Sequence, residues 1–183
     1  EKGVDAIKLL PQGGCPCSGE PEYRFKGEVP IVRLRPRVLE AGIEEAHRHG
    51  LRVTVHTHEE DRAIECLQAG ADGLEHGIIY EKFETDRVPE LLLRNDATYI
   101  PTLWLYDNDA SRHNLRAVQQ AGARIILGSD SYLGKGEPGE NSAIELERMV
   151  GAGLTPTEAL RAATSGGAWH NRCHDIGRVA EGA

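Results

Sequence analysis

The sequence lacks the long apolar runs and the positive charge that would point to a membrane or to nucleic acid. No stretch of about 18 or more apolar residues is present, so we expect no membrane-spanning helix. The formal net charge is −8, which argues against nucleic acid and acidic membrane surfaces as partners. No signal peptide opens the sequence, so we expect a cytoplasmic protein. Its first residues already read like the interior of a domain, which leaves open a segment upstream.

Cysteine is scarce. The four cysteines are Cys15, Cys17, Cys66 and Cys173. One proline separates Cys15 from Cys17, which is too tight for an ordinary structural disulfide, and Cys66 falls inside a predicted helix. We interpret all four as reduced thiols of a cytosolic protein. A disulfide or a zinc cluster is the alternative, and the pair Cys15 and Cys17 could capture stray zinc or copper beside a metal site.

The 183 residues are enough for one domain with a core, built from alternating strands and helices. Three times a helical segment ends in a small or polar residue plus glycine and leads, across a linker of at most two residues, into a strand, at Gly50, Gly70 and Gly122. This repetition is typical of βα units in a parallel sheet. About five strands are predicted. A closed (β/α) barrel needs eight, so an open five-stranded parallel sheet is the alternative architecture.

Apolar periodicity gives the boundaries of these elements. The expected strands are residues 4–8, 51–57, 73–77, 97–103 and 124–130. The expected helices lie near residues 35–49, 59–70, 88–92, 111–121, 142–152 and 155–164. Thr155, Pro156 and Glu158 have the spacing of a capping box at a helix start. Residues 11–30 are rich in glycine and proline and follow a strand, which makes them a candidate substrate loop.

Four residues with ligand-type side chains each close a short apolar run: Lys8, His56, His76 and Asp130. A strand that ends in such a side chain and is followed by a helix is how a (β/α) barrel presents chemistry at its C-terminal face. The four are far apart in the sequence, yet the same local pattern surrounds each one. This shared pattern predicts that they meet at one end of a sheet.

The histidines differ in how strongly they indicate a site. His56 and His58 lie two residues apart, so in a strand they face the same side, which favours a metal site. The alternative is one structural and one solvated histidine, and His58 could instead contact substrate or support the ligands. His76 is followed by Gly77, which allows a sharp exit from the strand.

The remaining histidines are interpreted as structural or solvated. They are His47, His49, His113, His170 and His174. His170 and His174 have the spacing of a helical metal pair, but we expect the helix to be broken by Gly166 and Gly167.

Lys8 and Asp130 each allow two interpretations. Lys8 stands among apolar residues, so a surface position is hard to arrange and we expect it to be buried. A depressed pKa would leave a nucleophilic amine, able to form a Schiff base or a carbamate that bridges metals. The alternative is a lysine that extends to the barrel rim. Asp130 would bind a metal or act as general base, or else cap a turn.

Taken together and in order, these pieces resemble the amidohydrolase superfamily, in particular its imidazolonepropionase and Xaa-Pro dipeptidase-like branch. The matching segments are GVDAIK at 3–8 with the following Gly13-Gly14, VTVHTH at 53–58, AGADGLEHG at 69–77, GSD at 128–130 and LTPTEALRAAT at 154–164. The tail, residues 175–183, resembles the return of that family to its small β-sandwich. The resemblance covers nearly the whole chain.

The resemblance implies an α/β fold, a partial (β/α)8 TIM barrel with parallel strands four to eight. It implies that Lys8 ends strand four and carries a carbamate derived from CO2 that bridges two divalent metals, with zinc the expected ion. His56 and His76 would end strands five and six and hold the second metal. Asp130 would end strand eight, touch the first metal and act as general base on the bridging hydroxide. The implied reaction is hydrolysis of an amide, lactam, dipeptide or other C–N bond in a small molecule.

The sequence departs from the family in one respect: the His-x-His of strand one is absent. Residues 1–183 would be the C-terminal portion of an amidohydrolase domain, without strands one to three and the β-sandwich. We interpret the chain as a fragment, because the retained motifs are intact. A degenerate half-barrel is the alternative. With two open sheet edges, we expect the isolated chain to aggregate or to need a partner, either a missing N-terminal segment or a homo-oligomer.

Two other functions stay open from the sequence. One is a mononuclear hydrolase of the deaminase or imidazolonepropionase type with Lys8 unmodified, and the other is a non-catalytic truncated barrel. Residues 11–30 and 99–107 are expected to shape the substrate pocket. His58 and Tyr99 are expected to contact substrate, with packing the alternative for Tyr99, Trp104 and Tyr106.

Overall fold

The computed structural model describes residues 3–11, 24–25, 29–30, 33–131, 139–173 and 175–181. Most of the candidate substrate loop at residues 11–30 lies outside these residues, and so do Cys15, Cys17 and His174. Cys66 and Cys173, which are described, are free cysteines. Among the described residues, no helix combines the length and apolar character needed to cross a bilayer.

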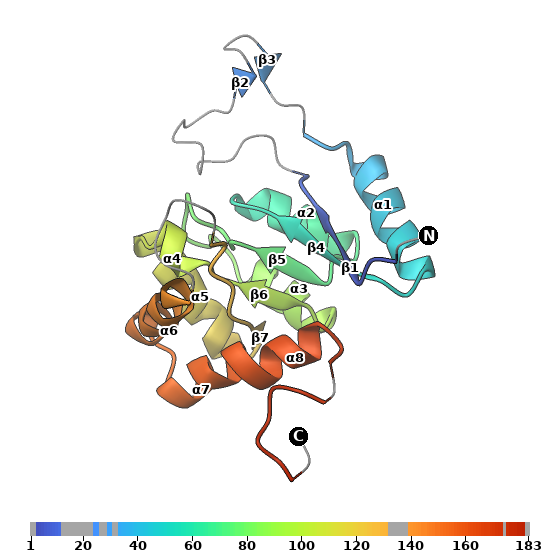
Figure 1. Ribbon diagram of the computed structural model, residues 1–183. Helices are drawn as coiled ribbons and strands as arrows, with labels where there is room; N and C mark the ends of the chain where they lie inside the picture. Colours follow the sequence, from blue (N-terminus) through green and yellow to red (C-terminus); the bar gives the residue numbers. More distant parts are fainter. Residues whose placement is uncertain are drawn as a thin grey trace.

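A five-stranded parallel sheet forms the centre of the molecule (Figure 1). Its strands, in spatial order, are β1 (Ala6–Leu9), β4 (Arg52–His56), β5 (Gly73–Glu75), β6 (Thr98–Ile100) and β7 (Arg124–Ile125). Two short strands, β2 (Arg24–Phe25) and β3 (Val29–Pro30), form a separate antiparallel pair. The spatial order of the five strands follows their order in the chain, as a succession of βα units requires.

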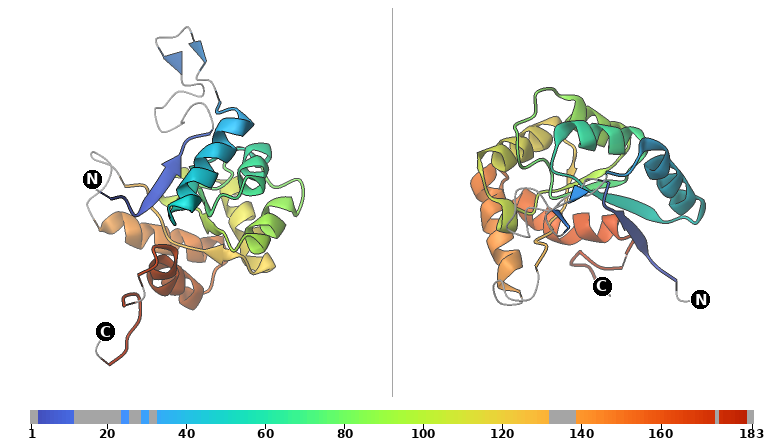
Figure 2. Two further views of the ribbon diagram at one scale, coloured as in Figure 1. Left: turned by 90° about the vertical axis from the view of Figure 1, so that its right-hand side faces the viewer. Right: turned by 90° about the horizontal axis from the view of Figure 1, so that it is seen from above.

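The helices form an arc around this sheet when it is seen from above (Figure 2). They are α1 (Pro36–Arg48), α2 (Glu60–Gln68), α3 (Arg87–Arg94), α4 (Leu103–Tyr106), α5 (Asp109–Ala121), α6 (Glu140–Ala152), α7 (Pro156–Arg161), the π-helical turn η2 (Ala162–Gly166) and α8 (Gly167–His170). The capping box predicted at the start of α7 is present. The side chains of Thr155 and Glu158 each accept a hydrogen bond from the backbone N–H of the other residue.

Strand alternation separates a core face from an inner face. Val53, Val55, Leu74 and Tyr99 are completely or almost completely buried and belong to one apolar core. That core also contains the buried face of α1, with Leu39, Ile43 and Ala46, and apolar residues of α2, α3 and α5. The intervening residues of the strands, among them Thr54 and Thr98, therefore face the opposite, inner side of the curved sheet.

The final helical segment covers the lower end of this inner face (Figure 1). His170 lies 3.0 Å from the Oγ1 atom of Thr98, and Trp169 lies against the guanidinium groups of Arg52 and Arg124. His170 is thus structural, as interpreted. The prediction that the helix breaks at Gly166 was wrong, because the chain accommodates its glycines in a π-helical turn and continues into α8.

Two strands are shorter than predicted. β6 ends at Ile100 because Thr102 adopts a left-handed φ of 50° and Leu103 begins helix α4. β7 ends at Ile125, and the N–H of Leu127 donates to the carbonyl oxygen of Ala162 instead of to a neighbouring strand. Both departures depend on contacts that are distant in sequence, which a local apolar pattern does not report.

Candidate functional site

Three histidines gather at the C-terminal ends of β4 and β5. The ring centroids of His56 and His58 are 4.4 Å apart, those of His56 and His76 are 4.7 Å apart, and those of His58 and His76 are 5.6 Å apart. All three side chains are buried. The prediction that His56 and His58 face the same side is confirmed by the contact between their rings.

The backbone brings His76 into this cluster. His76 follows the last residue of β5, where alternation alone would direct it with Leu74 toward the helices. Instead it has a left-handed φ of 69°, and Gly77 follows with a φ of 66°. A Cβ on Gly77 would lie 2.1 Å from the Oη atom of Tyr99, so only glycine fits there. A strained turn thus directs the imidazole toward His56.

Lys8 reaches the same cluster from β1. Its Nζ atom lies 3.4 Å from the Nε2 atom of His76, and in the sheet Lys8 is level with Thr54, two residues before His56. The expectation that Lys8 is buried was wrong. Among the described strands, β1 is the end strand of the sheet and pairs only with β4, so the Lys8 side chain is exposed to solvent.

Asp130 also lies near the cluster. It stands beyond β7, exposed and with a left-handed φ of 50°, and its negative charge acts to raise the pKa of His56. The structure therefore brings all four strand-end residues to one end of the sheet. Asp130 acts on this end through its charge, whereas Lys8, His56 and His76 are in contact.

Burial keeps the histidines uncharged. Burial lowers the pKa of His56 to about 4, assisted by the charge of Lys8 and opposed by that of Asp130. Burial also lowers the pKa of His58 to about 3 and that of His76 to about 2, and in both cases neighbouring His56 and Lys8 act in the same direction. At neutral pH all three rings are therefore neutral, which is the form of imidazole that binds metal ions.

The contact with Lys8 indicates where the proton of His76 lies. A lysine ammonium only donates hydrogen bonds, so Nε2 of His76 is the acceptor and the proton is on Nδ1. That Nδ1 atom lies 3.2 Å from the Oγ1 atom of Thr102, which can accept it. The His76 ring therefore presents the lone pair of Nε2 to the cluster, while its Nδ1–H group is held by the buried hydroxyl of Thr102.

The donor set fits a divalent metal such as zinc in part. The Nε2 atom of His56 is buried and has no hydrogen-bond partner among the described residues, and the Nε2 atom of His76 presents a lone pair beside it. Neutral imidazoles are common zinc ligands. Within the described ranges, no three or more His, Cys, Asp or Glu side chains form a complete metal-binding group. The further ligand that these two imidazoles need would come from a carbamylated Lys8.

Two tyrosines border the cluster. The ring of Tyr106 lies 5.2 Å from that of His58 and 5.7 Å from that of His76, and the ring of Tyr80 lies 5.6 Å from that of His58. Sequence reasoning named Tyr106 but missed Tyr80 and Thr102. Thr102 lay inside the predicted strand 97–103, so the sequence pattern gave no signal for its role.

Tyr99 does not join them. Its side chain is 1% exposed in the core, and its hydroxyl oxygen accepts a hydrogen bond from the backbone N–H of Ile78, with an N···O distance of 3.4 Å. The expectation that Tyr99 contacts substrate was wrong, because alternation in β6 places it on the helix-covered face of the sheet, beside Leu74. The packing alternative holds for this residue.

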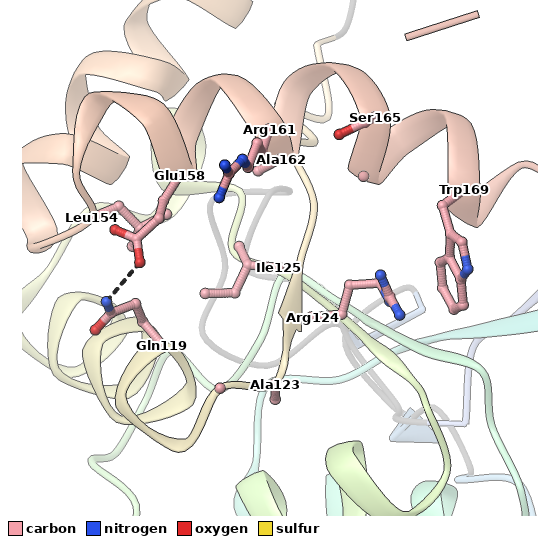
Figure 3. A pocket seen from close by; sticks show the side chains of 12 residues that line it. Gln119, Ala123, Arg124, Ile125, Leu154, Glu158, Arg161, Ala162, Ser165 and Trp169 are labelled. Carbon is pink, nitrogen blue, oxygen red and sulfur yellow. Dashed lines mark hydrogen bonds between the residues drawn. The ribbon is translucent and has the colours of Figure 1, made fainter. Parts of the chain in front are cut away.

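A cavity of about 470 Å³ lies elsewhere, beside the end strand β7 and between α5 and the α7–α8 segment (Figure 3). Its walls combine apolar residues such as Ile125 and Leu154 with the pair Gln119 and Glu158, whose Nε2 and Oε1 atoms are 3.0 Å apart. None of its lining residues belongs to the histidine cluster. It borders a sheet edge and not the candidate site.

The sequence and the fold both have known relatives. Ochratoxinase from Aspergillus niger is 29% identical over 184 aligned residues, which cover 90% of this chain and 35% of that protein. An uncharacterized protein of Mycobacterium tuberculosis is 30% identical over 150 residues, which cover 69% of this chain and 38% of that protein. The chain thus spans little more than a third of the length of these relatives.

Solved structures give the same picture. A Xaa-Pro dipeptidase with bound methionine in its active site superposes with a TM-score of 0.76 at 24% identity, over 98% of this chain and 47% of that one. The crystal structure of A. niger ochratoxinase superposes with a TM-score of 0.76 at 25% identity, over 98% of this chain and 43% of that one. The five parallel strands therefore have the fold of part of a (β/α)8 barrel, as the resemblance implied. The sequence model of the amidohydrolase family matches residues 32–183, and the chain belongs to this family of hydrolases.

Proposed function

We propose that the chain supplies the C-terminal half of the active centre of a metal-dependent hydrolase that cleaves C–N bonds in small molecules, such as amides, lactams or dipeptides. The observation that carries this proposal is the contact between Lys8 and His76 beside neutral, buried His56. Relatives named ochratoxinase and Xaa-Pro dipeptidase support the choice of amide and dipeptide bonds.

In this proposal His56 and His76 hold a divalent cation, with zinc the expected ion. When bound, such an ion supplies polarisation of the scissile carbonyl and a lowered pKa for a nearby water. Asp130 takes the proton of the attacking water on its carboxylate and later returns a proton to the leaving nitrogen. His58 lies against both ligand histidines and is placed to contact the substrate.

Lys8 is proposed to carry a carbamate. The ammonium first releases one proton to solvent, and the neutral amine nitrogen then forms a bond to the carbon of CO2 and releases a second proton to solvent. These two losses turn a cation into an anionic oxygen ligand. The exposed position of Lys8 leaves the amine accessible to CO2, and its proximity to His76 places the new oxygens beside the proposed ion. The second candidate is a mononuclear hydrolase with unmodified Lys8, favoured by the 3.4 Å contact that the free amine already makes with His76.

We further propose that residues 1–183 act as one part of a larger barrel. The chain matches 47% of the Xaa-Pro dipeptidase and 43% of ochratoxinase, and β1 and β7 are the end strands of its sheet. Strands one to three and a β-sandwich would come from a further segment, with a second copy of the chain as the alternative partner. A cytoplasmic location stays a prediction.

Hydrolysis of a panel of Xaa-Pro dipeptides and aryl amides tests the proposed activity. The 183-residue chain should be tested after zinc loading, both alone and fused behind the N-terminal barrel half of A. niger ochratoxinase. We expect turnover in the fused protein and little in the chain alone. A folded, zinc-loaded fusion that hydrolyses no member of the panel would contradict the proposal and favour the non-catalytic alternative.

A further inference from the structure

We propose that Glu145 is a positioning residue for His76 and that it acts through the backbone after Thr102. This inference rests on the proposed role of His76 as a ligand. It concerns a residue that lies on α6, 69 positions after His76, and that sequence reasoning did not single out.

The first link is the hydrogen bond between His76 and Thr102. The Nδ1 atom of His76 and the Oγ1 atom of Thr102 are 3.2 Å apart, and both side chains are buried. Thr102 has a φ of 50°, a left-handed conformation that a β-branched residue rarely adopts. Such a conformation persists only where neighbouring contacts hold it. Contacts from other residues therefore hold the Thr102 hydroxyl in its position.

The second link is a pair of α6 side chains, Glu145 and Arg148, that form hydrogen bonds with the backbone of the two residues after Thr102. The carboxylate of Glu145 accepts hydrogen bonds from the backbone N–H of Leu103, at 2.9 Å, and from that of Trp104. The Nη1 atom of Arg148 donates to the carbonyl oxygens of the same two residues, at 2.7 and 2.8 Å. Both amides and both carbonyls that follow Thr102 are thereby fixed to α6.

The chemistry of Glu145 suits this task. Its side chain is 0% exposed, and burial raises its pKa to about 7 although the two backbone N–H groups and Arg148 act against that rise. Each of its two oxygens accepts from one of these amides, whereas a glutamine would place an NH2 donor against one of the two N–H groups. Arg148 is in turn held by Asp107, at 3.6 Å, and Asp107 is bonded to Arg112 of α5.

The consequence for His76 is a fixed tautomer. With the Thr102 hydroxyl held in place, Nδ1–H has an acceptor, and the lone pair on Nε2 points at Lys8 and at the proposed ion. Loosening the backbone of residues 103–104 should free Thr102 to leave its left-handed conformation. The imidazole then loses its anchor and populates both neutral tautomers.

Long-range ¹H–¹⁵N NMR of the His76 ring in the metal-free 183-residue chain tests this directly. We expect the Nδ1–H tautomer alone in the wild type and a mixture of tautomers in Glu145→Gln and in Thr102→Val. Thr102→Ser, which keeps the hydroxyl, should show the Nδ1–H tautomer alone, as the wild type does. Zinc affinity should fall by about 10- to 100-fold in the first two variants, the range seen when partners behind a metal-bound histidine are removed.

Glu60→Gln is the matched control. Glu60 is another buried carboxylate, and it accepts hydrogen bonds from the backbone N–H groups of Glu84 and Thr85 at 2.7 and 3.4 Å. Its loss should lower stability but leave the His76 tautomer unchanged. If Glu145→Gln does not fold, Arg148→Met releases the carbonyls of the same two residues and carries the same expectation.

An unchanged His76 tautomer in folded Glu145→Gln or Arg148→Met would overturn the inference. So would the same tautomer mixture in Glu60→Gln. Because the NMR readout needs neither metal nor turnover, a shifted tautomer in a protein that binds no zinc would support the positioning role and count against the proposed function alone.

Discussion

The Nζ atom of Lys8 lies 3.4 Å from the Nε2 atom of His76, although 68 positions separate the two residues in the sequence. The contact forms because two βα units place strand ends side by side and a left-handed turn at His76 directs its ring inward. In the proposed hydrolase, carbamylation would replace this ammonium with an anionic oxygen ligand beside His76.

Carbamylation of Lys8 can be detected without any activity assay. We expect a ¹³C NMR carbamate resonance when the chain is incubated with ¹³C-bicarbonate and zinc, and its loss in Lys8→Met. Lys82→Met is the control, because Lys82 is exposed and its loss should leave the resonance in place. A resonance that persists in Lys8→Met, or that never appears in wild type with bound zinc, would favour the mononuclear alternative.

Gly77→Ala should destabilise the fold strongly. The left-handed φ of 66° costs an alanine about 1–2 kcal/mol. The overlap of its Cβ with Tyr99 should add about 1–3 kcal/mol. Gly50→Ala is the matched control, because Gly50 has a φ of 72° with no atom within 4 Å of an added Cβ. Urea denaturation should therefore show a clearly larger loss for Gly77→Ala, and equal losses would refute the role of the Tyr99 contact.

Acid should weaken the metal-free fold before the carboxylates titrate. In the unfolded chain the buried histidines gain protons near their ordinary pKa of 6.5, whereas in the fold the pKa values of His56 and His170 are lowered to about 4. His58 and His76 are lowered further, to about 3 and about 2. The unfolded state therefore binds more protons below pH 6.5, and the free energy of unfolding should decrease as the pH falls toward 4.

Urea midpoints measured between pH 7.5 and 5 would show this slope. His56→Gln should reduce it, and His113→Gln should not, because His113 is exposed on α5. A pH-independent midpoint across this range would contradict the neutral, buried state of the cluster.

Much of this site could be predicted from local sequence patterns, and the remainder depends on long-range contacts. His56 and His76 follow apolar runs, so their placement at strand ends could be read directly. The exposure of Lys8 could not, because it depends on β1 being the end strand of the sheet, and its apolar neighbours suggested the opposite.

Tyr99 in β6 and Thr102 just beyond it show the same limit. The face on which Tyr99 lies is set by the register between β5 and β6, and a one-residue difference in the assumed register reverses it. Thr102 meets His76 only because Glu145 and Arg148 of α6 hold the backbone that follows it. No local pattern reports such a contact, since its parts come from three separate segments of the chain.

Asp130→Asn should remove the proposed base while keeping a side chain of the same shape. In the fused, zinc-loaded hydrolase we expect kcat to fall by about 10²- to 10⁴-fold with a small change in KM. Asp109→Asn, in the first turn of α5, is the control and should leave kcat unchanged. Loss of less than tenfold for Asp130→Asn would assign the proton transfer to another group.

Zinc binding by the 183-residue chain tests whether His56 and His76 are metal ligands. The titration is best made in a Cys15→Ser, Cys17→Ser background, so that thiols of that pair do not bind the ion, and followed by calorimetry. We expect at least one zinc per chain, with affinity at least tenfold weaker in His56→Ala and in His76→Ala and unchanged in His113→Ala. No binding by the parent chain, or equal binding by all three variants, would contradict it.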